Sequence, residues 1–89
     1  MENVTVECGV VSESICVDGG VDVDVTVSVD GEEIEGEVTL VRHEVTGEFA
    51  SWGQPDHWVS GALLARINAR EDARDILTEL SAATSAAAN

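Results

Sequence analysis

The chain has 89 residues, enough for one domain with a modest hydrophobic core, and no run approaches the ~18 apolar residues of a membrane span. It carries 18 acidic residues, four arginines and no lysine, so its formal net charge is −14 at pH 7. Such a charge argues against direct binding of nucleic acid or anionic lipid, and it favours basic proteins or cations as partners.

Residues 3–46 alternate apolar and polar side chains with period two, which is the pattern of half-buried β-strands. A three-residue turn at residues 18–20 would place Val17 opposite Val21, with glycine supplying the left-handed conformation that such a turn favours. Before this turn, the first apolar row consists of Val4, Val6, Cys8 and Val10, and it resumes at Ile15 and Val17 after a polar turn or bulge at residues 12–14.

The two cysteines fall on opposite faces of this predicted sheet. Cys8 belongs to the apolar row, whereas Cys16 lies on the outer face beside Asp22. Side chains that point away from each other cannot form a disulfide without movement of the backbone. Two free thiols are therefore expected, in agreement with a reducing cytosol.

The clearest strand covers residues 21–29, where five valines alternate with polar residues. A row of β-branched side chains on one face favours a strand over a helix. Asp30 and Gly31 are a strong signal for a two-residue hairpin turn, and the return strand covers residues 32 to about 45. In this register the apolar rows coincide, as a buried face requires, with the pairs Val27–Ile34, Val23–Val38 and Val21–Leu40.

The second half of the chain has a helical pattern. Residues 47–54 form a link, and Pro55 and Asp56 suit the first turn of a helix. Asn68 with Glu71 resembles a capping box, which indicates a break or kink. The sequence thus predicts a single α+β domain, 1–89, with an acidic sheet half at 1–48. It comprises an antiparallel β-sheet of three to four strands at about residues 3–46, one kinked or two α-helices packed on its apolar face at about residues 55–82, and a frayed tail at 83–89.

No catalytic machinery, cofactor or metal is expected. The sequence contains no GxSxG, P-loop, GxGxxG or HExxH motif, and it lacks both tyrosine and lysine. Asp22 and Asp24 lie within a strand alternation, so their carboxylates line a flat face and do not converge as in a calcium loop. The spacing of the remaining metal-ligand types matches neither CxxC nor HxxxH, and these residues are Cys8, Cys16, His43 and His57.

The outer face of the predicted hairpin is the strongest functional signal. It sets Asp24 directly opposite Glu37, and facing like charges destabilise a sheet. Sequences that break such a local rule often do so at a functional site. Alternate side chains on a strand lie ~6.6 Å apart and neighbouring strands ~4.8 Å apart, a spacing that suits a groove built for phosphates. The candidate carboxylates for partner binding are Asp22, Asp24, Asp30, Glu33, Glu35 and Glu37.

Both tryptophans lie near the junction between the sheet and the helices. Trp58 falls on the apolar stripe of the helix and is expected in the core, whereas Trp52 is either a lid over the core or a partner-binding residue. Three arginines spaced four residues apart form a basic helix edge, which is either solvated or paired with local acids such as Glu71 and Asp75. These arginines are Arg66, Arg70 and Arg74.

The chain resembles phage-encoded acidic DNA mimics of the anti-CRISPR and uracil-DNA glycosylase inhibitor type. The resemblance covers size, acidity and a strand-borne carboxylate face formed by Asp22, Asp24, Glu33, Glu35 and Glu37. It implies an inhibitor that occupies the cationic channel of a nucleic-acid-binding complex, with a CRISPR effector as the favoured case. Such inhibitors share no common fold, so the resemblance implies a role and no individual site.

Location and an alternative role follow from the same features. The residues before Val4 lack the basic and apolar regions of a signal peptide, so a cytoplasmic location is expected, in the host cell if the protein is phage-encoded. The alternative is a non-catalytic phage structural or adaptor protein that acts through a sheet edge or the tryptophan junction. Its acidity would then serve solubility alone, as in a halophile. The charge balance argues against uniform solvation, since it is −12 over residues 1–48 and −2 over residues 49–89.

Overall fold

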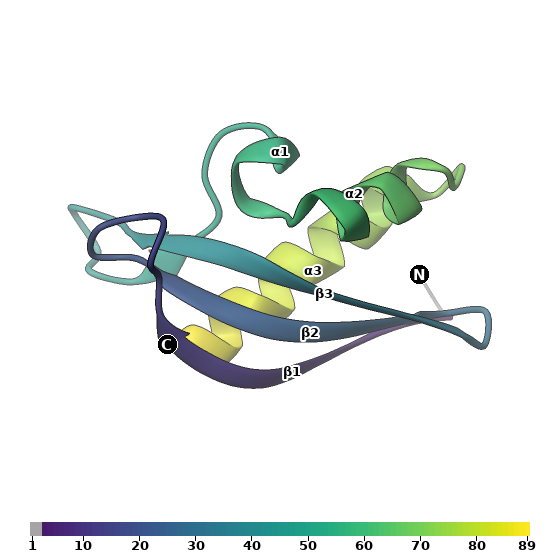
Figure 1. Ribbon diagram of the computed structural model, residues 1–89, viewed down its shortest axis with the longest axis horizontal. Helices are drawn as coiled ribbons and strands as arrows, with labels where there is room; N and C mark the ends of the chain where they lie inside the picture. Colours follow the sequence, from purple (N-terminus) through teal and green to yellow (C-terminus); the bar gives the residue numbers. More distant parts are fainter. Residues whose placement is uncertain (1–2) are drawn as a thin grey trace.

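The computed structural model describes residues 3–89 and consists of one antiparallel sheet with helices packed on one of its faces (Figure 1). The strands follow the order β1-β2-β3-β4 and are β1 (Val4–Glu13), β2 (Val21–Val29), β3 (Glu32–Arg42) and β4 (Phe49–Ala50). The helices are α1 (Pro55–Trp58), α2 (Gly61–Asn68) and α3 (Ala73–Ala88). The predicted α+β class, with an antiparallel sheet of three to four strands followed by helices, is confirmed.

The β2–β3 hairpin has the register that the sequence predicts. Val23 pairs with Val38, Val27 with Ile34 and Asp24 with Glu37. The two turn residues, Asp30 and Gly31, both have positive φ, at 51° and 85°. This is the backbone of a two-residue turn whose twist matches that of the flanking strands, so the turn fixes the pairing on both sides.

The predicted place of Val10 in the first apolar row is wrong. Cys8 pairs with Val25, but the next paired residue of β1 is Val11, which lies opposite Val23. Two residues, Gly9 and Val10, therefore stand against the single residue Asp24, which is a β-bulge. The bulge moves Val10 out of the apolar row, and this side chain is exposed.

The segment between β1 and β2 is a loop over residues 14–20, so the predicted three-residue turn is also wrong. β1 ends at Glu13, which pairs with Val21, and Ile15 points into solvent with 96% of its surface exposed. Cys16 is exposed in this loop and does not lie beside Asp22, whose partner in β1 is Ser12. The other cysteine lies on the inner face, as predicted, and the Cys8 thiol donates to the carbonyl of Ala83 at 3.6 Å.

The helical half contains three segments and extends further than predicted. α2 ends at Asn68 and α3 begins at Ala73, so a break lies where the capping signal indicated one. The frayed tail predicted at residues 83–89 is wrong, because α3 continues to Ala88. Thr84 is fully buried, and its hydroxyl donates to the carbonyl of Leu80 at 2.7 Å.

The buried apolar side chains form one cluster between the sheet and the helices. The sheet contributes its valine rows, and the helices contribute residues such as Leu63 and Ile76. In the cluster, α2 lies close to β3 at Gly36, because a Cβ added there would lie 2.5 Å from the Cβ of Leu63. Over residues 3–89, no helix combines the length and apolar composition needed to cross a membrane.

Candidate acidic interface

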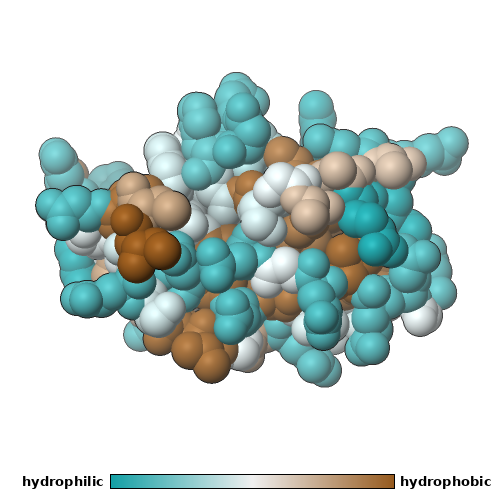
Figure 2. Space-filling model, viewed as in Figure 1, coloured by the Kyte–Doolittle hydropathy of each residue, from teal (hydrophilic) through white to brown (hydrophobic). Residues whose placement is uncertain are grey.

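The sheet face opposite the helices carries carboxylates from three strands. Asp24 and Glu37 are both exposed and directly opposite each other, while Glu33 faces Ser28 and Glu35 faces Thr26. In the view of Figure 1 the strands lie in front of α3, and Figure 2 shows hydrophilic residues spread over this side of the molecule. We call this surface the acidic face, formed by Glu7, Asp22, Asp24, Glu33, Glu35 and Glu37.

A shallow depression of about 410 Å³ lies within the acidic face. Its acidic lining comes from three strands, with Glu7 on β1, Asp24 on β2 and Glu35 on β3. Gly9 and Gly36 also line it, and a side chain at Gly9 would lie beside Asp24, so its absence there helps to keep the depression open. The face is therefore concave here and surrounded by negative charge.

The sequence interpretation missed Glu7 as a site residue. Its signal was present, because Glu7 lies between Val6 and Cys8 in the apolar alternation and must therefore point to the opposite face. It pairs with Thr26, the residue that also faces Glu35. The candidate site thus extends onto β1.

Glu37 is held in a crowded electrostatic environment. Its backbone N–H donates to Oγ of Ser60 at 3.1 Å, and its carbonyl accepts from the N–H of Ser60 at 2.9 Å. Partial desolvation and the nearby carboxylates of Asp22 and Asp24 raise the pKa of Glu37 above its ordinary value. Asp22 itself accepts a hydrogen bond of 2.7 Å from the hydroxyl of Thr39.

The raised pKa of Glu37 predicts how stability depends on pH. A carboxyl whose pKa is raised on folding favours the folded state fully below its unfolded pKa, and this contribution is lost as pH rises through the folded value. Glu37→Gln is therefore expected to melt at the same temperature as the wild type at pH 4 and at a higher temperature at pH 7. Thermal melts followed by circular dichroism at a series of pH values measure the difference.

A matched control separates this local effect from net charge. Glu79 is exposed on α3, and Glu79→Gln removes one charge from the protein without touching the Asp22–Asp24–Glu37 cluster. The control should change the melting temperature less than Glu37→Gln at pH 7. A Glu37→Gln protein that melts below the wild type at pH 7 would contradict the repulsion on this face.

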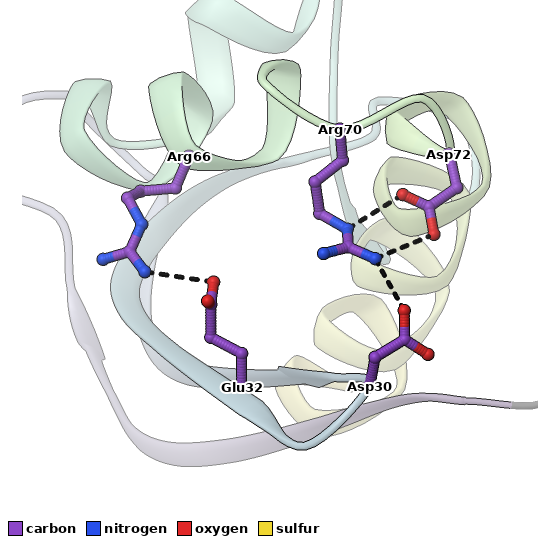
Figure 3. A network of polar contacts seen from close by, with 5 residues as sticks. All are labelled: Asp30, Glu32, Arg66, Arg70 and Asp72. Carbon is purple, nitrogen blue, oxygen red and sulfur yellow. Dashed lines mark hydrogen bonds and ion pairs between the residues drawn. The ribbon is translucent and has the colours of Figure 1, made fainter.

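Asp30 was predicted on the acidic face, but the structure places it elsewhere. Its carboxylate is ion-paired with Arg70 at 2.8 Å, and Arg70 also binds Asp72 at 3.0 Å (Figure 3). Glu32 is paired in the same way with Arg66 at 3.1 Å. These ion pairs therefore join the β2–β3 turn to the helical half, and Arg70 neutralises the charge of the Asp30 carboxylate.

Arg66 and Arg70 thus pair with Glu32 and Asp30, which are distant in sequence, while Arg70 also pairs with one local acid, Asp72, in place of Glu71 or Asp75. The carboxylate of Asp72 accepts a hydrogen bond from Arg70, which lowers the pKa of Asp72 below its ordinary value. These ion pairs lie at the hairpin turn and the α2–α3 junction. The acidic face gains no compensation from them.

The tryptophans lie on the helix-covered side. Trp58 is 6% exposed and belongs to the core, as predicted. Trp52 is half-buried against the core and stacks on His57, with ring centroids 6.4 Å apart and an interplanar angle of 19°. Trp52 therefore does not join the acidic face, and its packing resembles that of a lid.

Within the part of the chain that the structure describes, no group of three or more histidine, cysteine, aspartate or glutamate residues is arranged to hold a metal ion. The acidic face presents repeated negative charge and hydrogen-bond acceptors. No protein-family model, no curated protein and no solved structure matches the chain.

Proposed function

We propose that this chain is a non-catalytic protein inhibitor that binds a nucleic-acid-binding complex, with a CRISPR effector as the first candidate. The acidic face would enter the cationic groove of the target and replace the phosphates that the groove normally binds. The partner is then a basic protein or complex, and the chain binds neither nucleic acid nor membrane. The site of action is the cytoplasm of the host cell.

One observation carries this proposal. Among residues 3–89, the ion pairs of the arginines go to Asp30, Glu32 and Asp72, and none of them reaches the acidic face. Six carboxylates from three strands are left without a cation, including the directly facing pair Asp24–Glu37. A face of this kind gains most when an external cationic surface neutralises it.

The geometry of the sheet supports a phosphate-like arrangement. Side chains on one face of a strand repeat every ~6.6 Å and neighbouring strands lie ~4.8 Å apart, so the carboxylates form a two-dimensional array. Duplex DNA carries one phosphate per ~3.4 Å of each strand along its axis. Basic side chains spaced for phosphates can therefore meet several carboxylates of the acidic face together.

Competition with DNA tests the proposal. A guide-loaded CRISPR nuclease is mixed with fluorescent target DNA at a series of chain concentrations, and DNA binding is followed by fluorescence anisotropy. The apparent Kd for DNA should rise in proportion to chain concentration, and the inhibition should weaken between 0.1 and 0.5 M NaCl. A control without nuclease should show no binding of the chain to DNA.

Three results would contradict the proposed inhibition. A ternary complex of nuclease, DNA and chain would exclude competition for the groove. If none of a panel of nucleases from different CRISPR classes is inhibited, the first candidate is wrong. Salt-resistant binding that DNA does not affect would favour the adaptor role through a sheet edge or the tryptophan junction.

A further inference from the structure

Four large apolar side chains are exposed at one end of the sheet. Their exposed fractions are 66% for Val10, 41% for Val11, 96% for Ile15 and 87% for Val45. Glu13 at the end of β1 pairs with Val21 at the start of β2, which pairs with Leu40 near the end of β3, so the four residues share this end. Figure 2 shows a strongly hydrophobic group there, at the left of the view. We call these four residues the apolar end.

The two loops that contribute to the apolar end are held by their own hydrogen bonds. In the β1–β2 loop, Oγ of Ser14 accepts the N–H groups of Cys16 at 3.2 Å and Val17 at 3.1 Å, which holds the backbone around Ile15. In the β3–β4 turn, Nδ1 of His43 accepts the N–H of Val45 at 3.2 Å. Ile15 and Val45 are thus displayed on ordered tips, which lowers the entropic cost of using them in binding.

The apolar end is continuous with the acidic face. The β-bulge sets Gly9 and Val10 opposite Asp24, and a Cβ added to Gly9 would lie 3.6 Å from the Cβ of Asp24. Gly9 and Asp24 both line the acidic depression. Exposed Val10 therefore adjoins the depression directly, and one partner can cover both surfaces.

We infer that the apolar end docks on an apolar surface that borders the cationic groove of the same protein partner. This inference rests on the proposed function and specifies its partner. Large apolar side chains exposed at one end of a fold mark interaction sites, because burying them is favourable by about 25 cal/mol per Å². A simple polycation offers no apolar surface to bury, whereas a folded protein offers both kinds of surface. The apolar end would fix the position of the acidic face along the groove.

The charge around the apolar end favours a cationic protein as the partner over an anionic membrane or a second copy of the chain. Acidic residues surround the apolar end, since Glu13 ends β1, Asp18 lies in the first loop, and Glu44 lies in the β3–β4 turn beside Val45. These carboxylates repel anionic lipid. A second copy of the chain would bring together two molecules of net charge −14. A cationic protein is the occupant whose charge complements the surroundings of the four apolar residues.

The test uses a variant with Val10→Thr, Ile15→Thr and Val45→Thr. Threonine is also β-branched, so the change removes apolar surface without altering backbone preference strongly. Inhibition of the guide-loaded nuclease should weaken about tenfold or more, which corresponds to ~1.4 kcal/mol, and by the same factor at 0.1 and 0.5 M NaCl. Binding to a polyarginine peptide, which offers charge without a folded apolar surface, should not change. The matched control carries Ala65→Ser, Ala82→Ser and Ala86→Ser at exposed helix positions and should inhibit like the wild type.

The outcomes separate this inference from the function on which it rests. If the threonine variant inhibits as strongly as the wild type, the apolar end does not contact the partner, although the proposed function stands. If the wild type inhibits no nuclease, the proposed function fails and this inference fails with it. Sedimentation of the wild type as a dimer and of the threonine variant as a monomer would assign the apolar end to a second copy. Flotation with phosphatidylcholine vesicles would assign it to a membrane.

Discussion

A variant carrying Asp22→Lys, Asp24→Lys, Glu35→Lys and Glu37→Lys is expected to lose inhibition of the target nuclease while it remains folded. These side chains lie on the face opposite the helices, so their replacement leaves the buried apolar cluster unchanged. Each reversal removes an attraction and adds a repulsion. At ~1 kcal/mol or more per reversal, the affinity should fall by about 1,000-fold or more.

The fold of this variant should survive because the substitutions relieve repulsion. Each reversal adds two positive charges, so the net charge changes from −14 to −6. A smaller net charge reduces the self-repulsion that opposes the compact state. Circular dichroism and a thermal melt check the fold, and fluorescence anisotropy with labelled DNA measures the inhibition that remains.

A control variant with the same net charge decides whether position matters. It carries Asp56→Lys, Glu71→Lys, Asp75→Lys and Glu79→Lys, all at exposed positions of the helical half. Retention of most of the inhibition is expected. Similar losses in both variants would indicate diffuse charge attraction in place of a defined face. Full inhibition by the first variant would exclude the acidic face and direct attention to Trp52 and the apolar end.

The β2–β3 hairpin could be predicted residue by residue because its determinants are local. A two-residue turn at Asp30 and Gly31 fixes the register, and a slip of one residue would expose the valine row of β2. The same alternation defines the outer face, so the Asp24–Glu37 pair followed directly from the sequence. The central part of the candidate site was therefore accessible without the structure.

The pairing of β1 could not be derived in the same way. Val10 and Val11 are adjacent, so the alternation alone does not decide which of them continues the inner row. The bulge at Gly9 and Val10 resolves this choice through pairing with β2, some fifteen residues away in the sequence. The exposure of Val10 follows from that bulge, whereas Ile15 and Val45 are exposed in the loops after β1 and β3, and none of these exposures was predicted.

Asp30 shows a second limit of local reasoning. The alternation pattern gives no direction for a residue in a turn, and the φ of 51° at Asp30 takes it out of the strand geometry. Its partner Arg70 is separated from it by 40 positions and lies between α2 and α3. Ion pairs of this kind depend on the packing of helices against the sheet, which sequence periodicity does not fix.

Gly36→Ala is expected to destabilise the fold strongly, although alanine has an ordinary backbone preference there. Gly36 pairs with Val25 in the apolar row, and an added Cβ would lie 2.5 Å from the Cβ and 2.7 Å from Cδ2 of Leu63. Leu63 is fully buried, so β3 and α2 must move apart. Overpacking of this kind costs ~1–3 kcal/mol, which lowers Tm by roughly 5–20 °C in a domain of this size.

Two comparisons make the Gly36 prediction specific. Gly9→Ala adds the same methyl group to another strand, where the nearest atom would lie at an ordinary 3.6 Å, and its Tm should stay near that of the wild type. Leu63→Ala alone should cost ~2–5 kcal/mol. Its combination with Gly36→Ala should cost somewhat less than the two single changes together, because the contacts with Cγ and Cδ2 of Leu63 are removed while the contact with its Cβ remains. Purely additive losses, or a Gly36→Ala protein as stable as the wild type, would show that α2 does not rest on β3 at this glycine.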